Sequence, residues 1–187
     1  MTHGPRRPAL APPAVRTAVA RVDSPESFLQ QHYQRVWQTR MSDMPFVNPA
    51  LEVETVGFLR HEGDWLGVII TPWFLNLFLL CGGGMLWRDL AAGQRQLVQL
   101  PCGAMQFIAD DDPDLGLYQY CPLIAAVGTL PNQSSARQTA VDAMQAVLTP
   151  VVVADPAQSE ITQKTQDDPA ASAASRRGFF RRLGGTG

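Results

Sequence analysis

Two proline-containing segments place aromatic side chains beside a single asparagine, a combination suited to binding an apolar partner. The first covers residues 44–51 (MPFVNPAL) and the second covers residues 71–77 (TPWFLNL). Because proline fixes the backbone, the rings would form a preformed apolar groove in which the amide supplies one polar contact. The same residues also fit two rigid turns with an internally satisfied asparagine, and the sequence leaves both interpretations open.

Carboxylates are concentrated in the central part of the chain. Residues 23–150 carry thirteen Asp and Glu against six arginines, whereas residues 1–22 carry four arginines and no acid. An acidic central region argues against nucleic-acid binding, which needs a basic surface on the folded part. It favours a partner with a basic segment. The alternative is that the surplus carboxylates only keep the domain soluble.

Residues that could catalyse a reaction or hold a metal lack the required spacing. Residues 82–84 (GGG) are not followed by the Lys-Ser/Thr of a phosphate loop, and His61 has no second histidine at zinc-protease spacing. Cys81, Cys102 and Cys121 form no Cys-x-x-Cys pair, and their odd number fits a reducing compartment. We therefore expect no enzyme, metal or cofactor. A redox or iron-handling role for three converging cysteines is the alternative.

The hydropathy pattern predicts one α+β domain over residues 24–150. It is preceded by a Pro- and Ala-rich arm, residues 1–23, expected to be disordered. It is followed by residues 151–187, expected to be a flexible tail with an Arg-rich end. Apolar side chains recur at helical spacing over residues 24–44 and again over residues 134–148, which predicts a helix at each end of the domain.

Between the two helices, apolar runs bounded by turn residues predict an antiparallel sheet of about five to six strands. The expected strands cover residues 51–58, 65–71, 73–80, 97–100, 105–108 and 117–124, with a bulge at Gly57 and an acidic loop over residues 110–114. We expect both helices to lie on one face of this sheet. The longest apolar run, residues 66–81, falls short of the roughly 20 residues of a membrane span.

Several segments, taken in order along the chain, resemble segments of a known protein family. They are residues 37–41 (WQTRM), 44–51, 56–58 (VGF), 65–68 (WLGV), 70–77 (ITPWFLNL) and the turn at residues 100–103 (LPCG). Together they resemble the HybE/HupJ/HoxT family of [NiFe]-hydrogenase assembly proteins. The similarity runs from residue 28 to residue 148, which is nearly the whole expected domain.

The resemblance implies a cytoplasmic maturation chaperone rather than an enzyme, with no cofactor of its own. Its implied partner is the precursor of the small or large hydrogenase subunit, and in some members the twin-arginine signal peptide of the small subunit. Other hydrogenase maturation proteins are further implied partners. Some relatives carry a fused or neighbouring rubredoxin, but this chain lacks the paired cysteines that would hold its iron.

A twin-arginine leader offers two guanidinium groups followed by an apolar stretch, so its receptor should combine an acidic rim with an apolar groove. Exposed ion pairs contribute about 0–1 kcal/mol each, so apolar burial should supply most of the affinity. The candidate contact residues are Trp37, Asp43, Phe46, Asn48, Glu52, Glu54, Trp65, Trp73, Asn76, Asp110, Asp111, Asp112 and Asp114.

One part of the tail itself resembles the twin-arginine consensus. It consists of Ser175, Arg176, Arg177, Gly178, Phe179, Phe180 and Arg181. No apolar stretch follows it, so we do not expect an export signal. Three roles are compatible with its composition: occupying the leader groove until a client displaces it, anchoring weakly to anionic lipid, or serving as a solubilising end.

Overall fold

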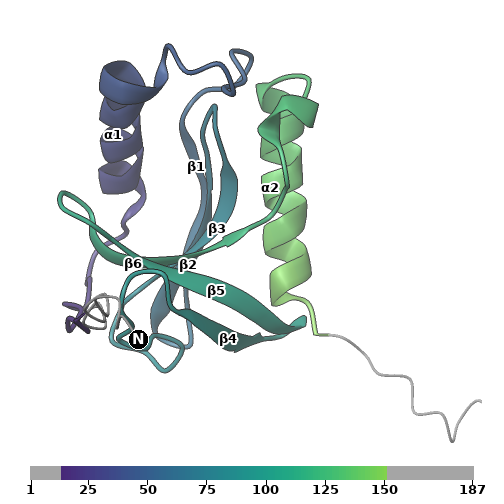
Figure 1. Ribbon diagram of the computed structural model, residues 1–187. Coiled ribbons are helices and arrows are strands. Elements are labelled where there is room, and N and C mark those ends of the chain that lie inside the picture. The colour runs from purple at the N-terminus through teal and green to yellow at the C-terminus, as the bar shows by residue number, and fades with distance from the viewer. Residues whose placement is uncertain (1–13, 151–187) are drawn as a thin grey trace, which may run out of the picture. The chain divides into compact units, whose positions relative to one another are not determined.

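The computed structural model describes residues 14–150, which form two helices, two short helical turns and six strands (Figure 1). The helices are α1 (Glu26–Val36) and α2 (Gln133–Leu148), and the turns are the π-helical η1 (Trp37–Met41) and the 3-10 turn η2 (Val127–Thr129). The strands are β1 (Glu54–His61), β2 (Asp64–Ile70), β3 (Leu75–Leu80), β4 (Arg95–Leu100), β5 (Gly103–Asp112) and β6 (Gly116–Pro122).

All six strands belong to one antiparallel sheet in the order β1-β2-β3-β6-β5-β4. This arrangement confirms the predicted α+β class, with an antiparallel sheet and a helix at each end of the domain. The register of β1 against β2 shifts between Val56 and Leu59, and Gly57 takes a positive φ of 66° there. The expected bulge at Gly57 is confirmed, since glycine adopts this backbone conformation without a side-chain clash.

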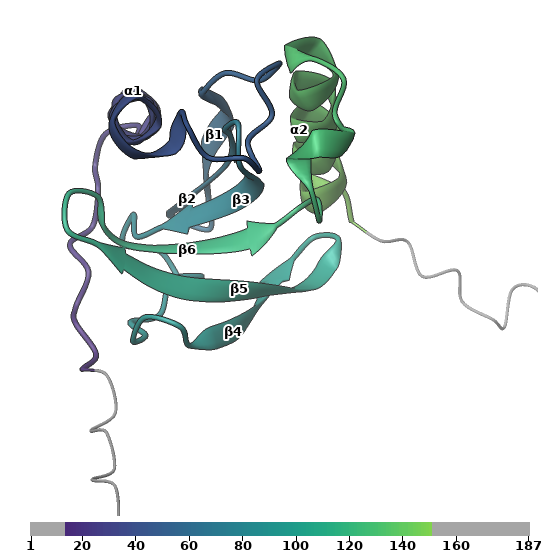
Figure 2. The same cartoon turned by 45° about the horizontal axis from the view of Figure 1, so that its top comes forward.

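The two helices lie on opposite faces of the sheet, so the expectation that both cover one face is wrong (Figure 2). In β2, Leu66 and Val68 belong to the core cluster that includes Met144 of α2. Ile69 of the same strand instead belongs to the cluster that includes Leu29 of α1. Neighbouring strand residues point to opposite faces, and β2 and β3 are buried along their entire lengths. Continuous apolar runs therefore need a helix on each side.

Residues 14–23 lie against the domain, although the whole arm over residues 1–23 was expected to be disordered. The backbone N–H of Arg21 donates to the carbonyl of Cys81 at 2.8 Å, and the indole Nε1 of Trp65 donates to the carbonyl of Arg21 at 3.0 Å. Arg16 forms an ion pair with Asp111. These long-range contacts hold residues that have no hydropathy periodicity of their own. Residues 1–13 lie outside the described part of the chain.

Candidate functional site

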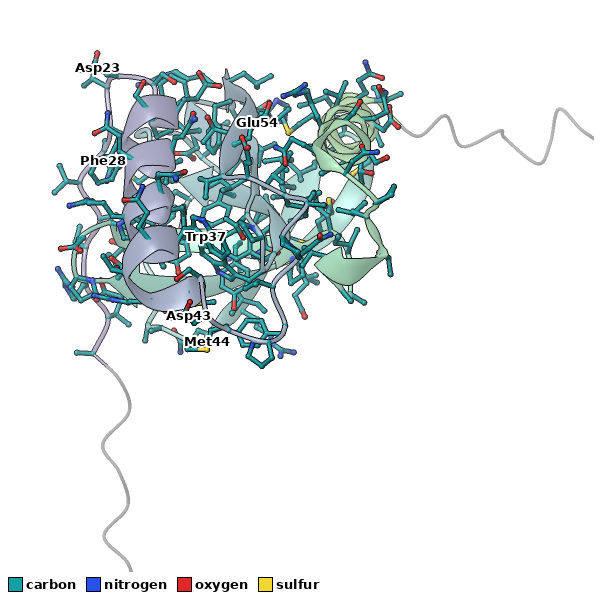
Figure 3. The ribbon with its side chains drawn as sticks, turned by 90° about the horizontal axis from the view of Figure 1, so that it is seen from above. Asp23, Phe28, Trp37, Asp43, Met44 and Glu54 are labelled. Carbon is teal, nitrogen blue, oxygen red and sulfur yellow. The ribbon has the colours of Figure 1, made fainter. Side chains whose placement is uncertain are left out.

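At the C-terminal end of α1, two tryptophan side chains stack on each other. The helix continues into the π-turn η1, in which the N–H of Ser42 donates to the carbonyl of Trp37 at 3.1 Å. The Trp37 indole stacks on that of Trp73, with ring centroids 6.1 Å apart and planes 16° apart. In Figure 3, Trp37 points from the helix toward the sheet, whereas Phe28 points to the other side of α1. Single π-turns occur frequently at functional sites.

The turn before β3 fixes Trp73. The buried Thr71 hydroxyl accepts hydrogen bonds from the N–H groups of Trp73 and Phe74, at 3.2 and 2.9 Å. On the other side, the N–H of Asn48 donates to the carbonyl of Pro72 at 2.7 Å. This bond brings the loop over residues 42–50 beside Trp73.

That loop carries two of the exposed large apolar side chains, Met44 at 42% and Phe46 at 59% of full exposure. We call Trp37, Met44, Phe46 and Trp73 the tryptophan surface. Two predicted contact residues, Trp37 and Trp73, are in direct contact there, and a third, Phe46, lies on the loop that the Asn48–Pro72 bond holds beside Trp73. Figure 3 shows Asp43 beside Met44 near the end of α1, and Asp43 is exposed as well.

Asn48 is buried and serves as an internal connector. Its amide donates to the carbonyls of Val127 at 2.9 Å and Leu130 at 2.8 Å, and its carbonyl accepts from the N–H of Ala50 at 3.0 Å. These bonds tie the loop over residues 42–50 to η2 ahead of α2. Asn48 therefore positions the loop of the tryptophan surface, and its amide hydrogens and carbonyl are engaged inside the protein.

A small cavity of about 180 Å³ lies on the α1 side of the sheet. Its walls are the aromatic rings of Tyr33, Phe74, Phe78, Tyr118 and Tyr120. Asn76 of β3 and Asp110 of β5 supply the polar groups, and both were predicted contact residues. We call it the tyrosine cavity. The Tyr33 ring also packs against Trp73 at 6.4 Å, which joins the cavity to the tryptophan surface.

The hydroxyl of Tyr118 donates to Oδ2 of Asp110 at 3.0 Å. Burial, together with the neighbouring Tyr33 and Asp110, raises the pKa of Tyr118 far above its ordinary value. Tyr118 therefore stays a neutral hydrogen-bond donor. Asn76 is only 8% exposed as a residue, and its side chain makes no hydrogen bond to any residue between 14 and 150.

The predicted acidic residues lie in several separate places. Oε1 of Glu54 pairs with Arg137 of α2 at 2.6 Å, and Oε2 accepts from Gln133 at 2.6 Å. Burial opposes ionisation of Glu54, but the bonds from Arg137 and Gln133 outweigh it and lower the pKa. In Figure 3, Glu54 is well separated from Asp43. Glu52 is exposed and shares a surface hollow with Trp37.

The acidic stretch near β6 is part of the sheet, not a free loop. Residues 110–112 pair with β6, so the expectation of a loop over residues 110–114 is wrong for these three. Asp112 Oδ1 accepts from the N–H groups of Asp114 and Leu115 within the tight turn, which lowers the pKa of Asp112 despite partial burial. With Asp111 bound to Arg16, the exposed carboxylate of this group is that of Asp114.

Trp65 lies away from the tryptophan surface. It is 9% exposed, and the guanidinium carbon of Arg60 lies 4.9 Å from the centroid of its ring. The predicted site residues did not include Tyr33, Phe74, Phe78, Tyr118 or Tyr120. Spacing could have indicated three of them, because alternate strand residues share a face, which places Phe78 with Asn76 on β3 and Tyr118 with Tyr120 on β6. The twin-arginine-like segment over residues 175–181 lies outside the described residues.

The cysteines are free and half-buried, in or beside strands. Burial raises the pKa of Cys81 and Cys121, which disfavours the reactive thiolate. Within residues 14–150, the group of potential metal ligands that comes together is His32, Asp112 and Asp114, and it includes no cysteine.

No helix in this part of the chain has the length and apolar character needed to cross a bilayer.

The fold and the site are those of a small α+β domain that presents an aromatic surface beside an aromatic cavity. Residues 24–182 match the family model described as "[NiFe]-hydrogenase assembly, chaperone, HybE", and the chain belongs to this family. The resemblance noted in the sequence is thereby confirmed.

Relatives and a solved structure agree with this assignment. The chain is 38% identical over 128 residues to "Probable rubredoxin HupJ" of Rhodobacter capsulatus, which covers 68% of this chain and 45% of that relative. It is 33% identical over 166 residues to "Hydrogenase expression/formation protein HoxT" of Azotobacter vinelandii, covering 84% of this chain and 95% of that one. The solution structure of HybE from Escherichia coli has a TM-score of 0.57 at 26% identity, covering 73% of this chain and 84% of that one.

Proposed function

We propose that this protein binds the precursor of a [NiFe]-hydrogenase subunit in the cytoplasm and holds it during assembly, by contact and without catalysing a reaction. Membership of the assembly-chaperone family supports the class of client. The observation that carries the proposal is the tryptophan surface. Aromatic and Met side chains are enriched in protein interfaces, and Phe46 and Met44 remain exposed there.

The part of the precursor that we assign to this surface is the twin-arginine leader of the small subunit. Such a leader joins guanidinium groups to an apolar stretch. The tryptophan surface offers rings for the apolar part, and Glu52, in the hollow beside Trp37, offers a carboxylate without a hydrogen-bond partner within residues 14–150. Apolar burial provides most of the affinity and charge provides the choice of partner.

Co-purification tests this function. Tagged full-length protein is expressed with the small-subunit precursor, with the same subunit lacking its leader, or with the large-subunit precursor. We expect the leader-bearing small subunit to be retained most strongly. Recovery of neither subunit would contradict the function, and equal recovery with and without the leader would contradict the leader assignment.

A matched pair of variants locates the contact. Phe46→Ser removes an exposed ring from the tryptophan surface, and Leu97→Ser removes a comparably exposed side chain from β4, at 59% and 66% exposure. Truncating an interface anchor costs more than about 1.4 kcal/mol, so Phe46→Ser should weaken retention at least about tenfold. Leu97→Ser should leave it unchanged. The reverse pattern would place the contact at the β4 edge of the sheet.

The three cysteines provide a separate test of the redox or iron-handling alternative. Their replacement by alanine should leave precursor retention intact, since none of them lies on the tryptophan surface. Loss of retention in a variant that still folds would revive the alternative.

A further inference from the structure

We propose that the tyrosine cavity binds the guanidinium group of an arginine side chain supplied by the bound polypeptide. This inference deepens the proposed function and rests on it for the source of the arginine. Three features of the cavity carry it: aromatic walls, a carboxylate without a cationic partner among residues 14–150, and an amide without a hydrogen bond to any residue in that range.

The walls suit a flat cation. Phe78 and Tyr118 stack with centroids 5.3 Å apart and planes 13° apart, and Tyr120 lies 6.4 Å from Phe78. Tyr33 and Phe74 form an edge-to-face pair at 5.3 Å on the side of α1. Aromatic faces attract cations, and they do so more strongly where water is displaced. A planar guanidinium group stacks on such rings, whereas an ammonium group does not.

The carboxylate of Asp110 supplies the counter-charge. Oδ2 accepts from the Tyr118 hydroxyl at 3.0 Å and Oδ1 from the N–H of Asp111 at 2.9 Å, which leaves each oxygen able to accept a second bond. Among residues 14–150, no Arg or His nitrogen lies within 4.0 Å of this carboxylate. Asp110 thus differs from Asp111 and Glu54, which are already paired with arginines.

The amide of Asn76 points to a ligand more directly. Asn76 as a residue is more than nine-tenths buried, and its side chain lines the cavity without a hydrogen bond to any described residue. The backbone of Asn76 is held on both sides, opposite Ile69 of β2 and Pro122 of β6. Among the described residues, Oδ1 of Asp111 is the one fully buried side-chain polar atom without a partner, so the amide atoms of Asn76 remain accessible from the cavity, and its carbonyl is free to accept from a bound guanidinium. Ordered water is the competing occupant.

Peptide binding to the full-length protein tests the site. The probes are acetyl-Ser-Arg-Arg-Gly-Phe-Phe-amide, its Lys-Lys counterpart, and its double-citrulline counterpart, which has the shape of arginine but no charge. Affinities are measured by calorimetry, and the Asn76 side-chain amide is followed by NMR. We expect the arginine peptide to shift the Asn76 signals and to bind about tenfold more tightly than either counterpart.

Asp110→Asn is the diagnostic variant, because it is isosteric and removes the charge. It should weaken the arginine peptide about tenfold and leave the citrulline peptide unchanged. Asp142→Asn, at an exposed acidic residue of α2 on the other face of the sheet, is the matched control and should change neither affinity by more than about twofold. If Asp110→Asn does not fold, the contrast among the three peptides on the unmodified protein still decides the question.

Equal binding of the arginine and citrulline peptides would overturn the site, as would Asn76 signals that move with none of the peptides. The latter result would assign the cavity to water. These outcomes differ from failure of the proposed function. A precursor that co-purifies without an arginine preference leaves the chaperone function standing, whereas an arginine-selective cavity in a protein that retains no precursor leaves only the site.

Discussion

The indole of Trp37 stacks on the indole of Trp73, at 6.1 Å and 16°, and so joins the end of α1 to the turn that precedes β3. Aromatic pairs of this kind contribute about 0.5–1.5 kcal/mol beyond the area they bury. A double-mutant cycle with Trp37→Ala and Trp73→Ala should therefore give a coupling of about 0.5–1.5 kcal/mol in the free energy of unfolding, measured by urea titration.

The same cycle has an internal control. Trp73 also packs edge-to-face on Phe74 at 5.6 Å, so Trp73→Ala should cost more alone than Trp37→Ala. Additive effects of the two substitutions would show that the stack does not join the two elements.

Asn48 joins the loop of the tryptophan surface to η2, and its removal should be costly. Asn48→Ala leaves the carbonyls of Val127 and Leu130 without their amide donor in a buried position. The Val127 carbonyl still accepts from the N–H of Leu130 at 3.0 Å, whereas the Leu130 carbonyl loses its donor. A buried group left without a partner costs about 1–3 kcal/mol, and the free energy of unfolding should fall by that amount. Thermal and urea unfolding measure this loss.

Asn48→Asp separates the two parts of the Asn48 interaction. Aspartate keeps an oxygen for the Ala50 N–H but cannot donate to the two carbonyls. It should destabilise the protein at least as much as Asn48→Ala at neutral pH. A stability equal to that of the unmodified protein would remove the connecting role.

The elements of the fold could largely be predicted from local patterns. Helical spacing and alternating runs predicted both helices and the strands, and Gly57 predicted the bulge. The side of the sheet covered by each helix could not be predicted this way, because a fully buried strand such as β2 has no polar face. The interaction of Gly82 and Gly84 with Asp64 could not be predicted from local patterns either. Their N–H groups donate to the buried carboxylate of Asp64. That contact depends on tertiary structure.

The site could be predicted only in part. Trp37 and Trp73 were selected by residue type, but nothing local to Glu54 reveals that Arg137 and Gln133 of α2 reach it. The tyrosine cavity could not be predicted from local sequence either. Asn76 and Asp110 come from β3 and β5, which flank β6, and sheet order is set by the pairing of distant strands.

The Glu54–Arg137 pair predicts a pH dependence of stability. The folded protein holds the pKa of Glu54 below its ordinary value of 4.5, because hydrogen bonds from Arg137 and Gln133 outweigh partial burial. A lowered pKa stabilises the folded state above the ordinary value, and this contribution is lost as the pH falls through the folded pKa. Urea unfolding of Glu54→Gln and of the unmodified protein measures this contribution. The difference between their free energies of unfolding should be largest near pH 7 and should shrink below pH 4.5.

Arg137→Gln supplies the complementary variant, since it removes the partner and keeps the carboxylate. It should remove much of the pH-dependent part of the stability, and the change should be small because the Arg137 side chain is exposed to solvent. A stability difference that is constant between pH 7 and pH 4 in both variants would show that Glu54 gains nothing from its partners in the folded state.

Arg21 should stabilise residues 14–23 of the arm more than Arg16 does. Its guanidinium carbon lies 4.5 Å from the centroid of the Phe28 ring, and NH2 donates to the carbonyl of Leu115 at 2.9 Å. Arg21→Ala removes both contacts and should cost about 1–2 kcal/mol of unfolding free energy. Arg16→Ala removes an exposed ion pair and should cost about 0–1 kcal/mol. Hydrogen exchange at the Arg21 N–H, bonded to Cys81, reports the arm directly, and equal protection in both variants would contradict the assigned role.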